Sequence, residues 1–262
     1  MKKKKKKKSI VRTKRLLSML KKIHLGGIFD ECILKIKKGK GEIIAVDITN
    51  SMIVMAKGSI MSKSVSGVFG LGNLELLVKF LSSIEEEKVP FKSSRNYFTI
   101  RRTDNKRRLD YLLTQTELIA TRFDEEDEGE SPYDKLNKMM KQSINLNGSF
   151  AKDFLTYIGL LKTKQVTMIY DGSENVSFIC GSSEGHKFEI QPDSKVEQEG
   201  GDEFQIKVNG EHLSRILSAI DFDEDELPIL SFAKDKPIMI EEGNIVWVLV
   251  PIIDIEEGIV GD

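Results

Sequence analysis

The chain has 262 residues, 40% of them hydrophobic, which is enough for one large core or two ordinary ones. No run approaches the roughly 20 apolar residues of a membrane-spanning helix, and the lysine-rich start lacks the apolar core of a signal peptide. The net charge of −1 hides an asymmetry, because residues 1–40 hold 16 Lys and Arg against two acids, whereas residues 41–262 hold 24 against 39. This segregation predicts a positive surface for a polyanion and an acidic surface elsewhere.

The first half begins with the tract Lys2–Lys8, which we interpret as a solvated tail. A nucleic-acid contact, a localisation signal and an expression artefact are the alternatives. An amphipathic helix is predicted over residues 12–24, and a second over residues 73–83 with Asn73 as its N-cap. Strands are predicted at residues 29–37, 41–48, 51–60, 64–69, 97–102, 108–115 and 117–122.

An acidic segment of low hydrophobicity, residues 124–132, interrupts this pattern and predicts an exposed linker that continues through residues 135–140. The succession then restarts with a strand at 143–146 and helices at 149–161 and 211–220. Further strands are predicted at residues 165–171, 176–180, 187–191, 203–208, 228–232, 237–241 and 245–250. We therefore predict an N-terminal domain at residues 1–123, a linker at 124–141 and a C-terminal domain at 142–262.

A hidden duplication relates the two halves. The apolar spacing i, i+3, i+4, i+7 of the first helix repeats about 138 positions later, as does that of the second. The repeated sets are Leu16, Met19, Leu20 and Ile23 with Phe154, Tyr157, Ile158 and Leu161, and Leu74, Leu77, Val78 and Leu81 with Leu213, Ile216, Leu217 and Ile220. The pattern predicts an α+β fold of two similar domains, each with antiparallel sheets and two helices.

The polar face of the first helix carries four bases and no acid: Lys14, Arg15, Lys21 and Lys22. A one-sided basic face without residues for reading base edges suits phosphate contact without sequence preference. On the other three helices the outward bases are Lys79, Lys152 and Arg215. For these three helices an ordinary solvated face is the alternative interpretation.

Residues that would carry catalysis or bind a metal are scattered. His24, His186 and His212 lie apart from any Cys or paired carboxylate at ligand spacing, so we expect no metal, no cofactor and no enzymatic activity. Asp221, Asp223 and Asp225 alternate like a calcium loop, but Glu226 replaces the required glycine. The two cysteines, Cys32 and Cys180, lie in apolar runs and are expected to be buried free thiols, which fits an intracellular, reducing compartment.

Several segments together resemble the sliding clamps of the proliferating-cell nuclear antigen (PCNA) type, including viral and phage relatives. The first helix, Thr13–Ile23, is similar to the inner helix of that family, and Asp47–Val54 to its "D-S-S-H-V-x-L-V" turn and strand. Phe150–Lys152 resembles its third helix start, and Lys236–Ile240 with Val246–Ile252 its closing strands. The match departs from the family in the lysine run at the first strand and in Val-Leu-Val-Pro at the usual Tyr-Leu-Ala-Pro.

The resemblance implies a DNA polymerase processivity factor, a ring that is a homotrimer, lined by helices and holding double-stranded DNA at Lys14, Arg15, Lys21, Lys22, Lys79, Lys152 and Arg215. It also implies an acidic exterior, subunits joined through the edge strands Arg108–Gln115 and Asn175–Gly181, and an ATP-dependent clamp loader as a partner. Polymerase and other partner peptides would bind a pocket formed by Met52, Ile53, Leu136, Pro237, Val248, Val250 and Pro251. The alternative is a clamp-fold processivity or checkpoint subunit that acts as a monomer or in a hetero-oligomer.

Overall fold

The computed structural model describes residues 9–104, 106–119, 132–181, 185–197, 201–222 and 226–253. The chain forms two compact units. The first comprises Met1–Gly129 with Asn244–Val246, and the second Glu130–Gly243 with Trp247–Asp262. Of the predicted linker at residues 124–141, residues 124–131 lie outside the described residues, as does the end of the predicted N-terminal domain at residue 123.

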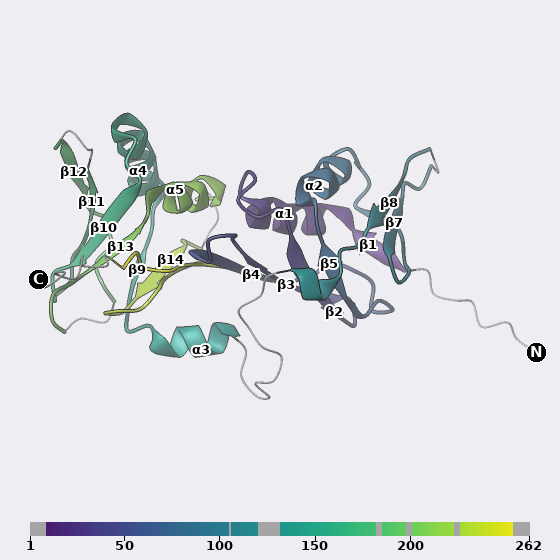
Figure 1. Ribbon diagram of the computed structural model, residues 1–262, viewed down its shortest axis with the longest axis horizontal. Coiled ribbons are helices and arrows are strands. Elements are labelled where there is room, and N and C mark those ends of the chain that lie inside the picture. The colour runs from purple at the N-terminus through teal and green to yellow at the C-terminus, as the bar shows by residue number, and fades with distance from the viewer. Residues whose placement is uncertain are drawn as a thin grey trace, which may run out of the picture. The chain divides into compact units, whose positions relative to one another are not determined.

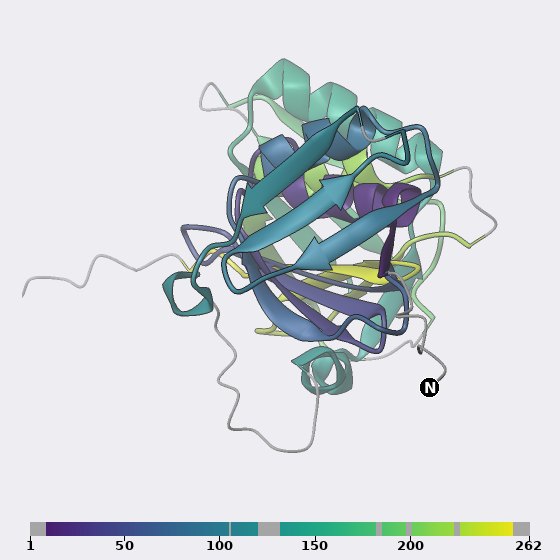
Figure 2. The same cartoon turned by 90° about the vertical axis from the view of Figure 1, so that its right-hand side faces the viewer.

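The first unit holds an antiparallel four-stranded sheet of strand order β1-β6-β7-β8 and a second antiparallel set of neighbouring strands, β5-β2-β3-β4. Figure 2 shows the strands β6 to β8, in blue to teal, in front of the helices of this unit. The elements in chain order are β1 (Ile10–Arg12), α1 (Thr13–His24), β2 (Cys32–Lys37), β3 (Lys40–Val46), β4 (Met52–Ser59), β5 (Gly67–Leu71), α2 (Leu74–Ser82), β6 (Lys88–Ser93), β7 (Tyr97–Arg101), β8 (Arg108–Leu112) and the 3-10 helix η1 (Thr116–Leu118).

The second unit begins with a helix, α3, that has no counterpart in the first. Its strands form a four-stranded sheet of order β12-β11-β10-β13 and a second set of neighbouring strands, β16-β15-β14-β9. The elements are α3 (Pro132–Met139), β9 (Gln142–Asn145), α4 (Gly148–Leu161), β10 (Gln165–Tyr170), β11 (Val176–Gly181), β12 (Lys187–Ile190), β13 (Phe204–Asn209), α5 (Gly210–Ala219), β14 (Ile229–Phe232), β15 (Ile238–Glu242) and β16 (Ile245–Leu249).

The predicted duplication is confirmed in the topology. Leaving out η1 and α3, each unit runs strand, helix, four strands, helix, three strands. The sheet β5-β2-β3-β4 maps strand for strand onto β13-β10-β11-β12, and β1-β6-β7-β8 maps onto β9-β14-β15-β16. The α+β fold of two similar domains is therefore the observed architecture.

Each pair of helices packs together over one face of its sheet (Figure 1). The apolar stripe of α1 is buried, with Leu20 and Ile23 fully covered, because α1 lies against α2 and β4. Gly58 of β4 lets α1 approach closely, since a Cβ atom there would stand 3.2 Å from Met19 Sδ. The face of the sheet at Gly58 is therefore the face that meets α1.

Three details differ from the sequence predictions. The predicted strand at 117–122 is wrong where it is described, because Thr116–Leu118 form a 3-10 turn. The strand β6 was not predicted: Pro90 and the preceding glutamates obscure the burial of Val89 and Phe91. Asn175–Gly181 is also not an edge, because β11 pairs with strands on both sides and β12 ends the sheet. Strand β8 does end its sheet, as expected for Arg108–Gln115.

Candidate nucleic-acid interface

The basic face of α1 is intact in the structure. Lys14, Arg15 and Lys21 are exposed, and Lys22 is half-buried, on the side opposite the apolar stripe. Within the described part of the chain, the side chains of Lys14, Arg15 and Lys21 pair with no carboxylate. Three full charges are therefore available to an external anion.

The start of α1 is unusual among the four helices of the repeat. The helices α2, α4 and α5 each begin with an asparagine whose side chain accepts a backbone N–H, at 2.9–3.1 Å. At the start of α1, Arg12 provides no such cap, and the first turn contains no acid. Lys14 and Arg15 therefore lie at the positive end of the helix dipole, where cations are unfavourable. The stability of the helix therefore does not account for these two charges.

The last turn of α1 has the opposite electrostatics. Lys21 and Lys22 lie beside the carbonyl end of the helix, where cations are favourable. The helix dipole thus stabilises the charges of Lys21 and Lys22 and destabilises those of Lys14 and Arg15. This difference provides a way to separate binding from stability.

The predicted bases of α2 and α5 are neutralised on their own helices. Lys79 Nζ lies 2.5 Å from Glu75 Oε1, and the hydrogen bond and charge of Lys79 lower the pKa of that carboxyl. Arg215 Nη2 lies 3.7 Å from Glu211 Oε1. Both are i, i+4 pairs exposed to solvent, so their positive potential is largely cancelled.

On α4, Lys152 is exposed and pairs with no acid among the described residues, but Asp153 follows it directly. The helix α2, which carries Lys79, packs against α1, so Lys79 belongs to the same layer of helices as the basic face of α1. The helices α4 and α5 form the equivalent layer of the second unit, with Lys152 and Arg215. The strongest unpaired charge is therefore on α1.

The predicted peptide-pocket residues fall into two groups by exposure. Met52, Ile53 and Val248 are buried, whereas the others are half-buried. Met52 and Ile53 belong to the first unit and the remaining five to the second. The half-buried residues are Leu136, Pro237, Val250 and Pro251. The pocket itself stays a prediction.

The turn before Met52 contains an apolar residue that the sequence reasoning passed over. The carboxylate of Asp47 accepts hydrogen bonds from the backbone N–H groups of Met52, at 2.6 Å, and Thr49, at 3.0 Å. This tight turn leaves Ile48 with 96% of its surface exposed. An isoleucine in a turn between two strands was the available signal, because such a side chain has no core to enter.

The later part of the predicted linker folds as α3. Tyr133 Oη donates a hydrogen bond to Glu241 Oε2 at 2.9 Å, which joins α3 to β15. Burial and this bond to a carboxylate raise the pKa of Tyr133 to about 12. Residues 132–139 are therefore helical and attached to β15 through Tyr133, while none of them is buried.

Potential metal ligands are not grouped in the parts of the chain that the structure describes. No three His, Cys, Asp or Glu side chains cluster at metal-binding distance among those residues. None of the described helices is long and apolar enough to cross a membrane. Cys32 and Cys180 are free and buried, as predicted.

No family model matches the chain, and no curated protein matches it in sequence. Solved structures do match. The crystal structure of the Helicobacter pylori beta clamp, in complex with 3,4-difluorobenzamide, matches 94% of this chain with a TM-score of 0.69 and 14% sequence identity. This chain spans 65% of the length of that clamp. The chain has the sliding-clamp fold.

The match thus supports a clamp-type fold without selecting the PCNA type that the sequence resembles. At 14% identity, shared residues cannot account for the likeness, so it lies in the arrangement of elements. The duplicated order of strands and helices described above is that arrangement.

Proposed function

We propose that this chain is a sliding clamp, a non-enzymatic processivity factor whose copies close into a ring around duplex DNA. The observation that carries the proposal is the combination of the clamp fold with three bases on α1, Lys14, Arg15 and Lys21, that pair with no carboxylate among the described residues. A surface of lysine and arginine without base-reading residues binds phosphates of any sequence. Weak contacts of this kind let a protein slide along DNA, while ring closure would keep it attached.

Within this proposal, α1 supplies the main contacts through Lys14, Arg15, Lys21 and Lys22. Lys152 adds a weaker one, and Lys79 and Arg215 contribute little because each already pairs with a glutamate. The proposed role for these bases is electrostatic and screened by salt.

The proposed ring is a homotrimer joined through strand edges. The strand β8 and the strand β12 each end a four-stranded sheet within their own unit. An unpaired edge presents free N–H and C=O groups, which a neighbouring copy can pair. We therefore replace the predicted Asn175–Gly181 by Lys187–Ile190 as the proposed partner of Arg108–Leu112.

The proposed partners are a DNA polymerase and other proteins that carry clamp-binding peptides, and an ATP-dependent loader that opens the ring. The proposed peptide pocket comprises the predicted residues together with Ile48, whose exposure suits contact with an apolar side chain. The free, buried cysteines agree with an intracellular, reducing compartment.

The experiment that tests the proposal has two measurements. Light scattering on the purified chain should give about three times 29.6 kDa. A single-chain mass would contradict the homotrimer and favour the monomeric or hetero-oligomeric subunit. After loading, the protein should remain on nicked circular DNA in high salt and run off the same DNA once it is linearised; equal loss from both would refute a topological ring.

A further inference from the structure

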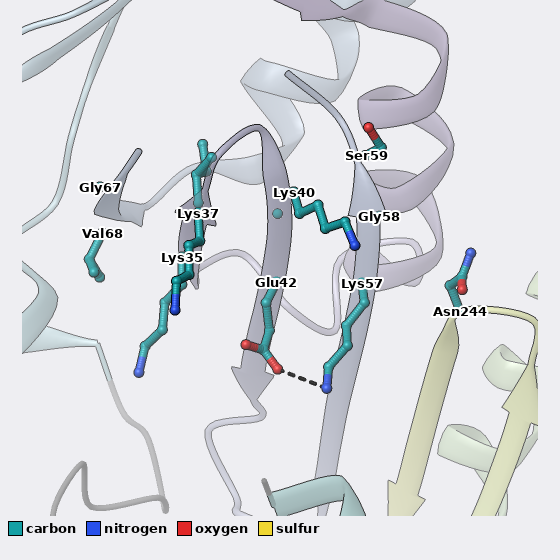
Figure 3. Close-up of a pocket in the computed structure, with 12 residues that line it drawn as sticks. Lys35, Lys37, Lys40, Glu42, Lys57, Gly58, Ser59, Gly67, Val68 and Asn244 are labelled. Carbon is teal, nitrogen blue, oxygen red and sulfur yellow. Dashed lines mark ion pairs between the residues drawn. The ribbon is translucent and has the colours of Figure 1, made fainter. Parts of the chain in front are cut away.

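Four lysines form a cluster on the sheet β5-β2-β3-β4 of the first unit, which we call the outer lysine cluster. It comprises Lys35 and Lys37 of β2, Lys40 of β3 and Lys57 of β4 (Figure 3). The strand register brings them together. Lys37 of β2 stands opposite Lys40 of β3, and Glu42 of β3 stands opposite both Lys35 of β2 and Lys57 of β4. Residues opposite one another in a sheet project to the same side, so these side chains share one face.

This face is the one opposite α1. Gly58 faces Met19 of α1, and the preceding residue, Lys57, points to the other side because side chains alternate along a strand. The buried residues Leu34 and Ile36 likewise alternate with Lys35 and Lys37. The positive charge of residues 1–40 is therefore divided between two faces of the first unit. A duplex held on α1 does not reach the outer lysine cluster.

The cluster borders a cavity of about 790 Å³. Glu42 is the single carboxylate among its lining residues, and it forms an ion pair with Lys57 at 3.2 Å. Lys37 and Lys40 are exposed, and their side chains pair with no acid in the described residues. Val68, which is 52% exposed, adds an apolar wall. The cavity thus offers an unbalanced positive charge within a concave surface, a combination that an anionic ligand would satisfy.

The residues that line the cavity indicate which class of anion it would bind. Among the described residues, no aromatic side chain lines the cavity, so this part of the chain offers none of the stacking surfaces that single-stranded nucleic acid uses. The described lining also contains no arginine, the side chain suited to bidentate binding of phosphate. Lys35 and Lys37 are two residues apart on one strand, which separates them by about 6.6 Å. An extended peptide presents alternate side chains at the same repeat.

We propose that the outer lysine cluster binds an acidic, extended segment of a partner protein, with carboxylates at alternate positions. This binding is independent of ring closure and of DNA, because the whole site lies in the first unit on the face away from α1. Its ligand contacts are ion pairs, so the affinity falls as salt rises. The apolar wall at Val68 favours an aliphatic residue beside the carboxylates.

The test is fluorescence anisotropy of the full chain with a labelled ten-residue peptide of alternating Glu and Ser. The matched probes are the same peptide with Gln in place of Glu, and a ten-nucleotide thymidine strand. The Glu peptide should bind, and Lys37→Glu/Lys40→Glu should weaken it about five- to thirtyfold, the effect of losing and reversing two exposed ion pairs. The control Lys92→Glu/Lys106→Glu changes the net charge equally at exposed positions outside the cavity, and should alter the affinity less than twofold.

Glu42→Gln provides a gain-of-affinity test that misfolding cannot imitate. Removing this carboxylate releases Lys57 from its ion pair and raises the positive charge of the cavity. Binding of the Glu peptide should tighten about two- to fivefold. The proposal is overturned if the Glu peptide does not bind, if the control reversal weakens it equally, if Glu42→Gln leaves it unchanged, or if only the thymidine strand depends on Lys37 and Lys40.

Discussion

Reversing the charges at the two ends of α1 should weaken DNA binding alike but change stability in opposite directions. The two variants are Lys14→Glu/Arg15→Glu in the first turn and Lys21→Glu/Lys22→Glu in the last. A carboxylate is favourable at the start of a helix and unfavourable at its end, by about 0.3–1 kcal/mol per exposed site. After screening, the first variant should gain about 1 kcal/mol in free energy of unfolding and the second should lose about as much.

The binding side of this prediction follows from counterion release. Each phosphate contact contributes about 0.9 to the slope of log affinity against log salt concentration. If the four bases of α1 each hold one phosphate, that slope is about −3.6 from α1 alone, and either double reversal should reduce it by about 1.8. The assay is anisotropy of a labelled 30-base-pair duplex between about 50 and 200 mM salt, with thermal melts of the same samples.

The control for this prediction is Lys92→Glu/Lys106→Glu, which changes the charge of the same unit away from α1. A loss of duplex binding in the control as large as in the two α1 variants would show that only net charge matters. If the affinity for the duplex instead followed the stability of each variant, so that the first-turn reversal bound DNA more tightly, the basic face would not be the contact. If both α1 variants were destabilised equally, the helix-dipole reasoning would be wrong.

Three further outcomes follow from other contacts. Lys79→Gln should reduce the salt slope of duplex binding less than Lys21→Gln does, because Lys79 is already paired; equal reductions would contradict this. Tyr133→Phe should speed amide hydrogen exchange in residues 132–140, since the bond to Glu241 is lost, and in the native chain this attachment should persist below pH 10 and disappear as the pH rises through about 12. The thiol of Cys180, whose pKa burial raises to about 11, should resist a thiol reagent at pH 8 until the chain unfolds, and rapid reaction in the native state would refute its burial.

Much of the fold could be predicted because the buried face of a helix or strand places apolar residues at regular intervals in the sequence. The helices α1, α2, α4 and α5 lie within one or two residues of their predicted bounds, since each buries an apolar stripe against a sheet. The strand β6 escaped because Pro90 is atypical of a strand, although Val89 and Phe91 are buried by long-range partners. The local sequence pattern does not show contacts with residues that are distant in the chain.

Strand order was the least predictable part of the candidate assembly surface. The segments at β11 and β12 both read as short strands, and nothing local shows which of them ends the sheet. The local sequence also did not show which face of the sheet carries the lysine charges. The alternation of Lys35 and Lys37 with Leu34 and Ile36 shows that the lysines share a face, but only packing of α1 on β4 shows that this face is opposite the helix.

The duplicated fold and its unequal charges bear together on how a clamp of this kind would hold DNA. The units share their topology because each must bury the same helical stripes, yet α1 carries four bases on its polar face whereas its counterpart α4 carries Lys152 beside Asp153. On the proposed ring, the first unit of each copy would therefore supply most of the positive potential, and the second very little. Alternating strong and weak sectors would keep a duplex centred without fixing its rotation or register. Lys152→Glu should then change the salt slope by no more than one contact, about 0.9, and a larger change would show that the second unit grips DNA as firmly as the first.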